Sequence, residues 1–262
     1  MRKNIVLALL GVVCCLMVSA QQKVSILGDS YSTFKGYLQP DTNAVWYPSP
    51  DNRNDVVKVE QTWWYQFINN YGYQLEVNNS FSGSTICNTG YRKEDYSDRS
   101  FITRMDKLGN PDIVLIFGAT NDSWAKVPLG KFKYAGWTKE ELYSFRPALA
   151  YLFDGCKKLY PKAQLYFVLN SELRDSINHA VHSLCDFYGV ECIKLHDIDK
   201  QRNHPSQAGM KVISEQIKAF MDEREEDLKD GVRRRPRGQF HHHGFGQEHH
   251  HHHHHHEHDS IE

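Results

Sequence analysis

The sequence predicts an α/β domain with a parallel, doubly wound sheet of five strands, spanning residues 21–221. Short apolar runs recur at long intervals, and several lack alternating polar residues, as is typical of strands that helices bury on both faces. Stretches with helical spacing of apolar residues lie between the runs. The runs cover residues 24–27, 75–77, 113–117, 165–169 and 190–195, and the helical stretches cover 61–71, 139–160, 171–188 and 206–221.

The chain begins with the pattern of an export signal. Arg2 and Lys3 precede an uncharged apolar stretch over residues 5–18, and Val18-Ser19-Ala20 has the small residues expected at a cleavage site. The stretch is shorter than the about 20 residues that a membrane-spanning helix needs. We therefore expect residues 1–20 to be removed, leaving an exported protein, periplasmic or extracellular, without a stable membrane span.

The composition excludes two classes of protein. The 262 residues include 31 Lys and Arg against 32 Asp and Glu. This balance indicates no basic face for phosphates, so a nucleic-acid partner is not expected. Hydrophobic residues make up 40% and aromatic residues 12% of the chain. These fractions are too high for a wholly disordered protein, so the chain contains a folded core.

The cysteines of the predicted domain are Cys87, Cys156, Cys185 and Cys192. In an exported protein, Cys185 and Cys192 are close enough in sequence to join a helix to the following strand by a disulfide. Buried free thiols are the equal alternative. Because no Cys-x-x-Cys pair occurs, the sequence supports neither a redox motif nor a zinc ribbon.

From Asp222 onward the composition changes, and we expect residues 222–262 to form a disordered tail. An acidic run precedes an arginine cluster and most of the 16 histidines, with too few apolar residues for a core. Neutral imidazoles bind Zn and Ni, so the tail is either a natural metal-binding segment or a purification tag. The candidate ligands are His249, His250, His251, His252, His253, His254, His255 and His256.

Four polar motifs lie where the predicted strands end. Gly28-Asp29-Ser30 follows the first strand, and a serine in a tight turn there projects into the crevice where doubly wound folds bind ligands. Gly83 follows the second strand, and a glycine lets a backbone N–H approach a reacting oxygen closely. Asn121 follows the third strand, and His204 lies between the last strand and the last helix. All four should meet at the carboxyl edge of the sheet.

In this order the motifs resemble the four blocks of the SGNH (GDSL-type) hydrolase family, over residues 23–221. The resemblance implies a flavodoxin-like three-layer α/β/α sandwich and an enzyme that hydrolyses carboxylic esters through an acyl-enzyme. It also implies that Ser30 is the nucleophile and His204 the base. The N–H groups of Ser30 and Gly83 and the amide of Asn121 would form the oxyanion hole. Such chemistry requires no metal or organic cofactor.

The chain departs from the family pattern at two positions. Ala119 stands where the third block has a glycine, and Gln201 stands where the fourth block has an aspartate. A neutral amide cannot stabilise an imidazolium as a carboxylate does. We therefore expect Asp199 to orient His204 as the third catalytic residue, with Asp197 as the other candidate. The alternative is a Ser–His dyad in which a backbone carbonyl or Gln201 orients the ring.

Aromatic residues crowd the segments after the first and third motifs, which flank the predicted crevice. These rings are Phe34, Tyr37, Trp46, Tyr47, Trp63, Trp64, Tyr65, Trp124, Tyr134 and Trp137. Flat rings suit sugars as well as acyl chains, and no long apolar lid occurs, so we expect a small acyl group such as acetyl on a carbohydrate. For any single ring, packing is the simpler interpretation. The alternatives are a lipid or lysophospholipid esterase, and a non-catalytic glycan-binding module with a metal-binding tail.

Overall fold

A computed structural model describes residues 20–231, and its central feature is a parallel sheet of five strands. The strands are β1 (Lys23–Gly28), β2 (Gln74–Ser80), β3 (Ile113–Gly118), β4 (Gln164–Leu169) and β5 (Glu191–Lys194). They lie in the order β2-β1-β3-β4-β5, and every neighbouring pair is parallel. All five predicted strands are confirmed, and their order is that of flavodoxin-like folds.

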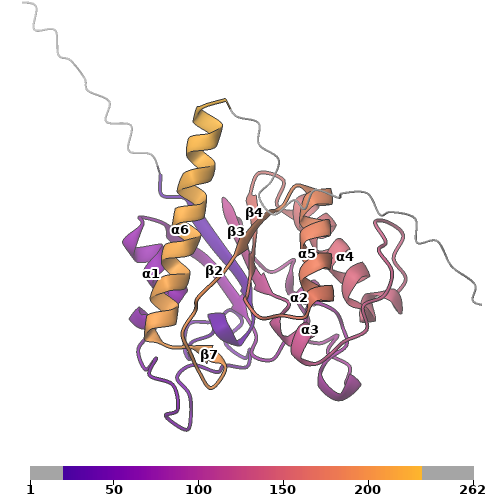
Figure 1. Cartoon of the computed structure of the whole chain (residues 1–262), viewed down its shortest axis with the longest axis horizontal. Coiled ribbons are helices and arrows are strands. Elements are labelled where there is room, and N and C mark those ends of the chain that lie inside the picture. The colour runs from indigo at the N-terminus through magenta and orange to yellow at the C-terminus, as the bar shows by residue number, and fades with distance from the viewer. Residues whose placement is uncertain (1–19, 232–262) are drawn as a thin grey trace, which may run out of the picture.

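Helices cover both faces of the sheet, which completes the expected three-layer sandwich (Figure 1). The helices α1 (Trp63–Asn70) and α6 (Gln207–Lys229) pack on one face. The helices α2 (Phe101–Arg104), α4 (Phe145–Leu159) and α5 (Asp175–Tyr188) pack on the other. A short helix, α3 (Thr120–Trp124), follows β3 at the carboxyl edge.

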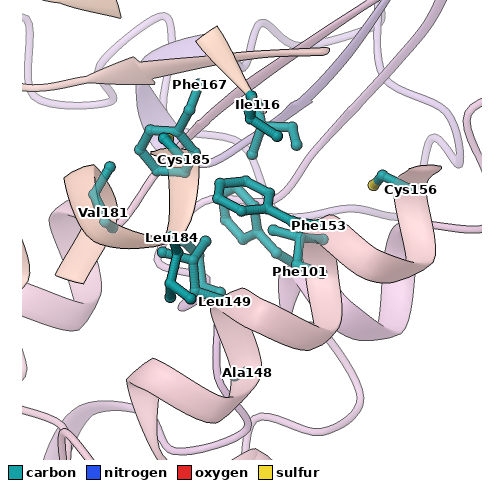
Figure 2. Packing of buried hydrophobic residues seen from close by; sticks show 14 of the residues in the cluster. Phe101, Ile116, Ala148, Leu149, Phe153, Cys156, Phe167, Val181, Leu184 and Cys185 are labelled. Atoms are coloured by element: carbon teal, nitrogen blue, oxygen red, sulfur yellow. The ribbon is translucent and has the colours of Figure 1, made fainter. Parts of the chain in front are cut away.

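Two hydrophobic cores lie on opposite faces because neighbouring residues of a strand point in opposite directions. In β1, Ile26 belongs to the core beneath α1 and α6, whereas Leu27 belongs to the core beneath α2, α4 and α5. Figure 2 shows part of the second core, where Phe101, Phe153 and Phe167 gather between helices and sheet. Both strand faces are therefore apolar, as the unbroken apolar runs predict.

Two helices begin later than their apolar spacing predicts. Residues 139–144 contain a 3-10 turn (Glu141–Tyr143), and α4 starts at Phe145 after an extended Ser144. Pro147 lies in the first turn of α4, where its missing N–H leaves no helical bond unmade. The helix α5 starts at Asp175 rather than at residue 171. The remaining 3-10 turns are Ser30–Ser32, Val59–Gln61 and Tyr91–Lys93.

The expected end of the folded region at Met221 is wrong, because α6 continues to Lys229. Arg224, in this extension, forms an ion pair with Glu191 of β5 at 2.7 Å. Lys218 pairs with Asp222 one turn later in the same helix, and such pairs support helices that are exposed on one side. The charged residues after 221 therefore extend a helix that is anchored to the sheet.

Several sequence predictions lie outside the described residues, among them all but the last residue of the export signal predicted over residues 1–20 and the candidate metal ligands 249–256. Within residues 20–231, the cysteines Cys87, Cys156, Cys185 and Cys192 are buried and free, the second of the two alternatives. The same part of the chain contains no helix that is long and apolar enough to cross a membrane.

Candidate active site

Ser30 lies immediately beyond β1, in a tight turn built by the aspartate of its motif. Asp29 accepts a hydrogen bond from the Tyr31 N–H at 3.0 Å, which starts the 3-10 turn Ser30–Ser32. Burial raises the pKa of the Asp29 carboxyl to about 7. Because Ser30 is the first residue of the turn, its own N–H has no carbonyl within the turn to bond.

His204 approaches Ser30 from a small hairpin made of β6 (Lys200–Gln201) and β7 (His204–Pro205). The two loop residues, Arg202 and Asn203, have φ angles of 55° and 59°, as a tight two-residue hairpin loop requires. The Nε2 atom of His204 lies 2.9 Å from the Oγ atom of Ser30. The structure therefore brings together the two side chains that the sequence predicts to react.

The other ring nitrogen of His204 contacts no carboxylate. Its Nδ1 atom lies 2.8 Å from the backbone carbonyl oxygen of Arg202, a geometry in which Nδ1–H donates. The predicted contact with Asp199 is not made, because the Asp199 carboxylate accepts a hydrogen bond from the Ser206 hydroxyl. Asp197 instead contacts His196. The arrangement is that of the alternative dyad, in which a backbone carbonyl orients the ring.

The start of α6 explains why Asp199 is held away from His204. The Ser206 N–H donates to the Asp199 carbonyl at 3.0 Å, which extends the hairpin by one pair of residues. Gly209 lies so close that a Cβ there would be 2.1 Å from the Asp199 carbonyl oxygen. Asp199 therefore packs on the first turn of α6. Gln201 also points elsewhere, since its side-chain oxygen accepts from the Asp55 N–H at 2.8 Å.

Aromatic rings surround His204. Trp46 stacks on the imidazole, with ring centroids 3.7 Å apart and an interplanar angle of 1°. The Tyr31 ring is tilted against the imidazole, and the Trp124 ring meets it in an edge-on arrangement. This burial lowers the pKa of His204 to about 4, and the Arg202 carbonyl opposes the shift. The ring is thus neutral near pH 7, and the face of Trp46 can stabilise the cation that forms when His204 accepts a proton.

The histidine hairpin, residues 199–206, is anchored by side chains from the long segment between β1 and β2. The Tyr31 hydroxyl donates to the Asn203 carbonyl at 2.6 Å, and the Tyr47 hydroxyl donates to the Pro205 carbonyl at 2.8 Å. The Asn54 amide donates to the Pro205 carbonyl at 3.1 Å. The sequence predicts Tyr47 only as a wall or packing residue and does not reveal these anchoring hydroxyl groups. Trp63 and Trp64 are buried in the core, as the packing interpretation predicts.

The candidate oxyanion donors follow β2 and β3. Gly83 has a φ angle of 80°, and a Cβ there would meet no other heavy atom within 4 Å, so open space borders it. Asn121 donates to the Ser84 carbonyl at 3.0 Å and accepts from the Tyr91 hydroxyl at 2.6 Å. Together these bonds fix which end of the amide carries the N–H groups. The sequence does not point to Tyr91, which lies in the short 3-10 turn Tyr91–Lys93 and belongs to no recognisable motif.

A buried arginine ties the ends of β1 and β2 together. Arg104 of α2 donates to the carbonyls of Asn79 at 2.6 Å and Gly28 at 3.1 Å, and to the Ser84 hydroxyl at 2.9 Å. Burial lowers the pKa of Arg104 to about 9. Nothing in the sequence marked this residue, because its helix is only four residues long and carries no periodic signal. Arg104 holds the motifs of Ser30 and Gly83 in register.

Two hollows flank the tip of the histidine hairpin, and Asn203 borders both. One has a volume of about 480 Å³ and extends from Trp124 to Lys200; the other, of about 390 Å³, extends from Trp46 to Arg202. Another cavity, of about 410 Å³, opens near Lys157 and shares no lining residue with them. Among residues 20–231, no group of three or more His, Cys, Asp or Glu side chains could hold a metal ion.

Comparison with known proteins adds the family. The family model described as GDSL-like lipase/acylhydrolase matches residues 22–221. A Bacteroides ovatus protein described as a GDSL-like lipase is 62% identical, with 78% of this chain and 99% of that chain covered and a TM-score of 0.77. A Bacteroides uniformis protein of the same description is 56% identical, with 78% of this chain and 97% of that chain covered and a TM-score of 0.77.

A family two carbohydrate esterase from Clostridium thermocellum, in complex with cellohexaose, shares the fold at 16% identity and a TM-score of 0.53, with 80% of this chain and 65% of that chain covered. No curated protein matches the chain. The family match covers the sheet and all four motifs, and the two Bacteroides proteins match nearly along their whole length. The chain therefore belongs to the GDSL-like lipase/acylhydrolase family.

Proposed function

We propose that this protein is a serine esterase that removes a small acyl group, such as acetyl, from a carbohydrate. The observation that carries the proposal is the 2.9 Å contact between Ser30 Oγ and His204 Nε2. The contact has the geometry of a nucleophile paired with its base. Family membership supports ester hydrolysis as the reaction.

In the proposed reaction, neutral His204 accepts the Ser30 proton while Oγ forms a bond to the ester carbonyl carbon. The carbonyl oxygen becomes an oxyanion and accepts hydrogen bonds from the N–H groups of Ser30 and Gly83 and from Asn121. The tetrahedral intermediate then collapses, and the alcohol leaves with the proton from His204. Water attacks the resulting acyl-enzyme with His204 again as base, which releases the acid and restores Ser30.

The imidazolium that forms in both steps needs stabilisation, which a triad obtains from a carboxylate. Here the Nδ1–H of His204 donates to the Arg202 carbonyl oxygen, which carries only a partial negative charge. The stacked face of Trp46 supplies electron density above the same ring. We infer that this carbonyl takes the place of the absent carboxylate in orienting the ring, and that the Trp46 ring offsets part of the cost of burying the cation.

The surface beside the histidine hairpin favours a polar alcohol and a short acyl group. Both hollows beside Asn203 are lined mainly by polar and charged residues, including Lys200 in one and Asp51 in the other. A long acyl chain needs an apolar channel, whereas sugars use hydrogen bonds together with flat rings such as Trp46 and Trp124. The fold shared with a carbohydrate esterase is consistent with this choice.

The test compares 4-nitrophenyl acetate, butyrate and octanoate with acetylated xylo-oligosaccharides. We expect the acetyl esters to be hydrolysed fastest and acetate to be released from the oligosaccharides. Ser30→Ala should abolish both activities, while Ser183→Ala on α5 is a matched control that should retain them. A preference for octanoate would indicate a lipid esterase instead. Glycan binding without acetate release would indicate a binding module.

Two expectations about the ends of the chain remain proposals. We propose that the protein is exported with Gln21 as its first residue, which N-terminal sequencing of the secreted protein tests. We also propose that the histidine-rich tail binds Zn or Ni independently of catalysis. Calorimetric titration with Ni of the full chain and of a chain ending at residue 231 tests the second proposal, and equal binding by both would contradict it.

A further inference from the structure

The hollow of about 480 Å³ beside the tip of the histidine hairpin carries an excess of positive charge. Lys126, Arg174 and Lys200 line it, against the single carboxylate of Glu172. Within residues 20–231, none of the three cations forms an ion pair with a carboxylate. Glu172 therefore offsets only part of the positive charge, and a net positive charge is left for a ligand.

Lys200 is the most informative of these cations because it is half-buried. Its ammonium donates to the side-chain oxygen of Asn170 at 3.1 Å and lies 5.9 Å from the centre of the Tyr31 ring. Burial lowers the pKa of this lysine, while Glu172 opposes the shift. An ammonium has three N–H donors, so this contact leaves further donors for an anion. A partly desolvated charge also binds an anion more strongly than an exposed one does.

Lys200 is itself a residue of the histidine hairpin, in β6, and hydrogen bonds link its side chain to the tip of that hairpin. The Asn170 amide donates to the Tyr31 hydroxyl at 3.3 Å, and that hydroxyl donates to the Asn203 carbonyl, next to His204. The positive charge of Lys200 also contributes to lowering the pKa of His204. An anion bound at Lys200 would offset this repulsion and favour the imidazolium that forms during the reaction. Anion binding in the hollow would thus favour proton transfer to His204, the step that the carboxylate of a triad would otherwise assist.

We propose that this hollow is an anion subsite and that the alcohol part of the substrate is an acidic sugar, carrying a carboxylate or a sulfate near the ester. The inference rests on the proposed esterase function, because it names the substrate of that site. Lys200 would donate to the anionic group, and Lys126 and Arg174 would add positive charge around it. Trp124, at the border of the hollow, would contact the sugar ring.

The kinetic test uses three esters that differ in one group. They are methyl 3-O-acetylglucoside, the corresponding glucuronoside, and the glucoside with a 6-sulfate. At low salt we expect kcat/KM to be about tenfold higher for a charged ester than for the neutral one, since a charge-assisted hydrogen bond contributes about that factor. A larger gain for the glucuronoside identifies a carboxylate, and a larger gain for the sulfate ester identifies a sulfate. Equal values for charged and neutral esters would overturn the proposal.

Variants locate the effect. Lys200→Met and Lys126→Gln should each reduce the preference for the charged ester, with Lys200→Met bringing the ratio of kcat/KM values close to one. Lys162→Gln, in the turn between α4 and β4, removes the same charge far from the hollow and should keep the ratio. Added salt should reduce the ratio for the unmodified protein, because exposed charges are screened. A ratio that persists in both hollow variants would place the anion elsewhere.

A binding experiment separates this inference from the esterase proposal. Saturation-transfer NMR on Ser30→Ala protein compares methyl glucuronoside and methyl glucoside 6-sulfate with neutral methyl glucoside, none of which carries an ester. Preferential binding of a charged sugar, reduced by adding Lys200→Met, supports the subsite even if no ester is hydrolysed. Equal binding of charged and neutral sugars overturns it, even if the neutral ester is a good substrate.

Discussion

The two halves of the candidate site are built in different ways. Ser30, Gly83 and Asn121 follow strands of the sheet, and Arg104 bonds to the carbonyl groups around them. His204 instead lies on a hairpin outside the sheet, held by hydroxyl and amide groups from residues 31–54. The first half, which we call the sheet half, takes its geometry from the parallel strands. The second half, the hairpin half, depends on a long segment packing against it, so the two halves should respond differently to substitution.

The largest expected effect involves both halves together. Ser30→Ala and His204→Ala should each lower kcat by more than about a thousandfold, because the proton transfer needs both groups. The double variant should be hardly slower than either single variant. Steady-state kinetics with 4-nitrophenyl acetate measure this. If the two losses multiplied instead, Ser30 and His204 would act independently, and the proposed pairing would be wrong.

The next effect concerns the sheet half. Asn121→Ala should lower kcat by about 10²–10³ with little change in KM, since an oxyanion donor acts mainly in the transition state. Tyr91→Phe should cause a smaller loss, because the amide remains but the hydroxyl that fixes its orientation is gone. If the Asn121→Ala variant instead showed a raised KM and a normal kcat, Asn121 would be a binding residue.

The hairpin half gives the sharpest contrast with the sequence-based expectation. Asp199→Asn should leave kcat nearly unchanged, because the carboxylate contacts Ser206 rather than His204. Tyr47→Phe should lower kcat by about tenfold, since it weakens the anchoring of the hairpin at the Pro205 carbonyl. The comparison is made at equal folded fraction, checked by circular dichroism. A loss of orders of magnitude in Asp199→Asn would restore a triad.

The same contrast explains which parts the sequence could predict. The unbroken apolar runs predict the five strands, and motifs that follow strands must lie at the carboxyl edge, so the sheet half was predictable. The hydrogen-bond partner of His204 Nδ1 could not be predicted, because it is a backbone carbonyl and any residue type can supply one. Contacts such as Tyr31 to Asn203 and Tyr47 to Pro205 join residues more than 150 positions apart, and only the folded chain brings them together.

The pH dependence tests the environment of His204. Burial lowers its pKa to about 4, so the neutral base persists as the pH falls, and kcat/KM should decline only near pH 4. An unperturbed histidine would give a decline near pH 6.5. Because the pKa is lower in the folded state, protonation of the unfolded chain should also reduce stability as the pH falls from about 6.5 towards 4.

Trp46→Ala sharpens this prediction. Removing the stacked ring exposes one face of His204 to water, so the acidic decline should move up by about one unit towards 6.5. The exposed Trp124 is the control, since Trp124→Ala removes a ring that is more distant from His204 and meets it edge-on rather than stacking on it. An unchanged or lowered midpoint for Trp46→Ala would mean that the ring stabilises the cation more than it excludes water.

The smallest expected effect lies in the sheet half, at Ala119, which stands where the family has a glycine. Ala119 has a φ of 74°, which costs an alanine about 1–2 kcal/mol relative to a glycine. Ala119→Gly removes that strain but exposes a void where a buried methyl contributes about 0.8 kcal/mol. It also adds about 0.4–1 kcal/mol of chain entropy to the unfolded state. These contributions nearly cancel, so the free energy of unfolding should change by less than about 1 kcal/mol, and kcat should not change.

Urea denaturation measures the free energy of unfolding of Ala119→Gly, and ester kinetics measure its kcat. A loss above about 2 kcal/mol would mean that the methyl group packs so well that alanine is the better residue here, and a drop in kcat would show that the Asn121 turn depends on it.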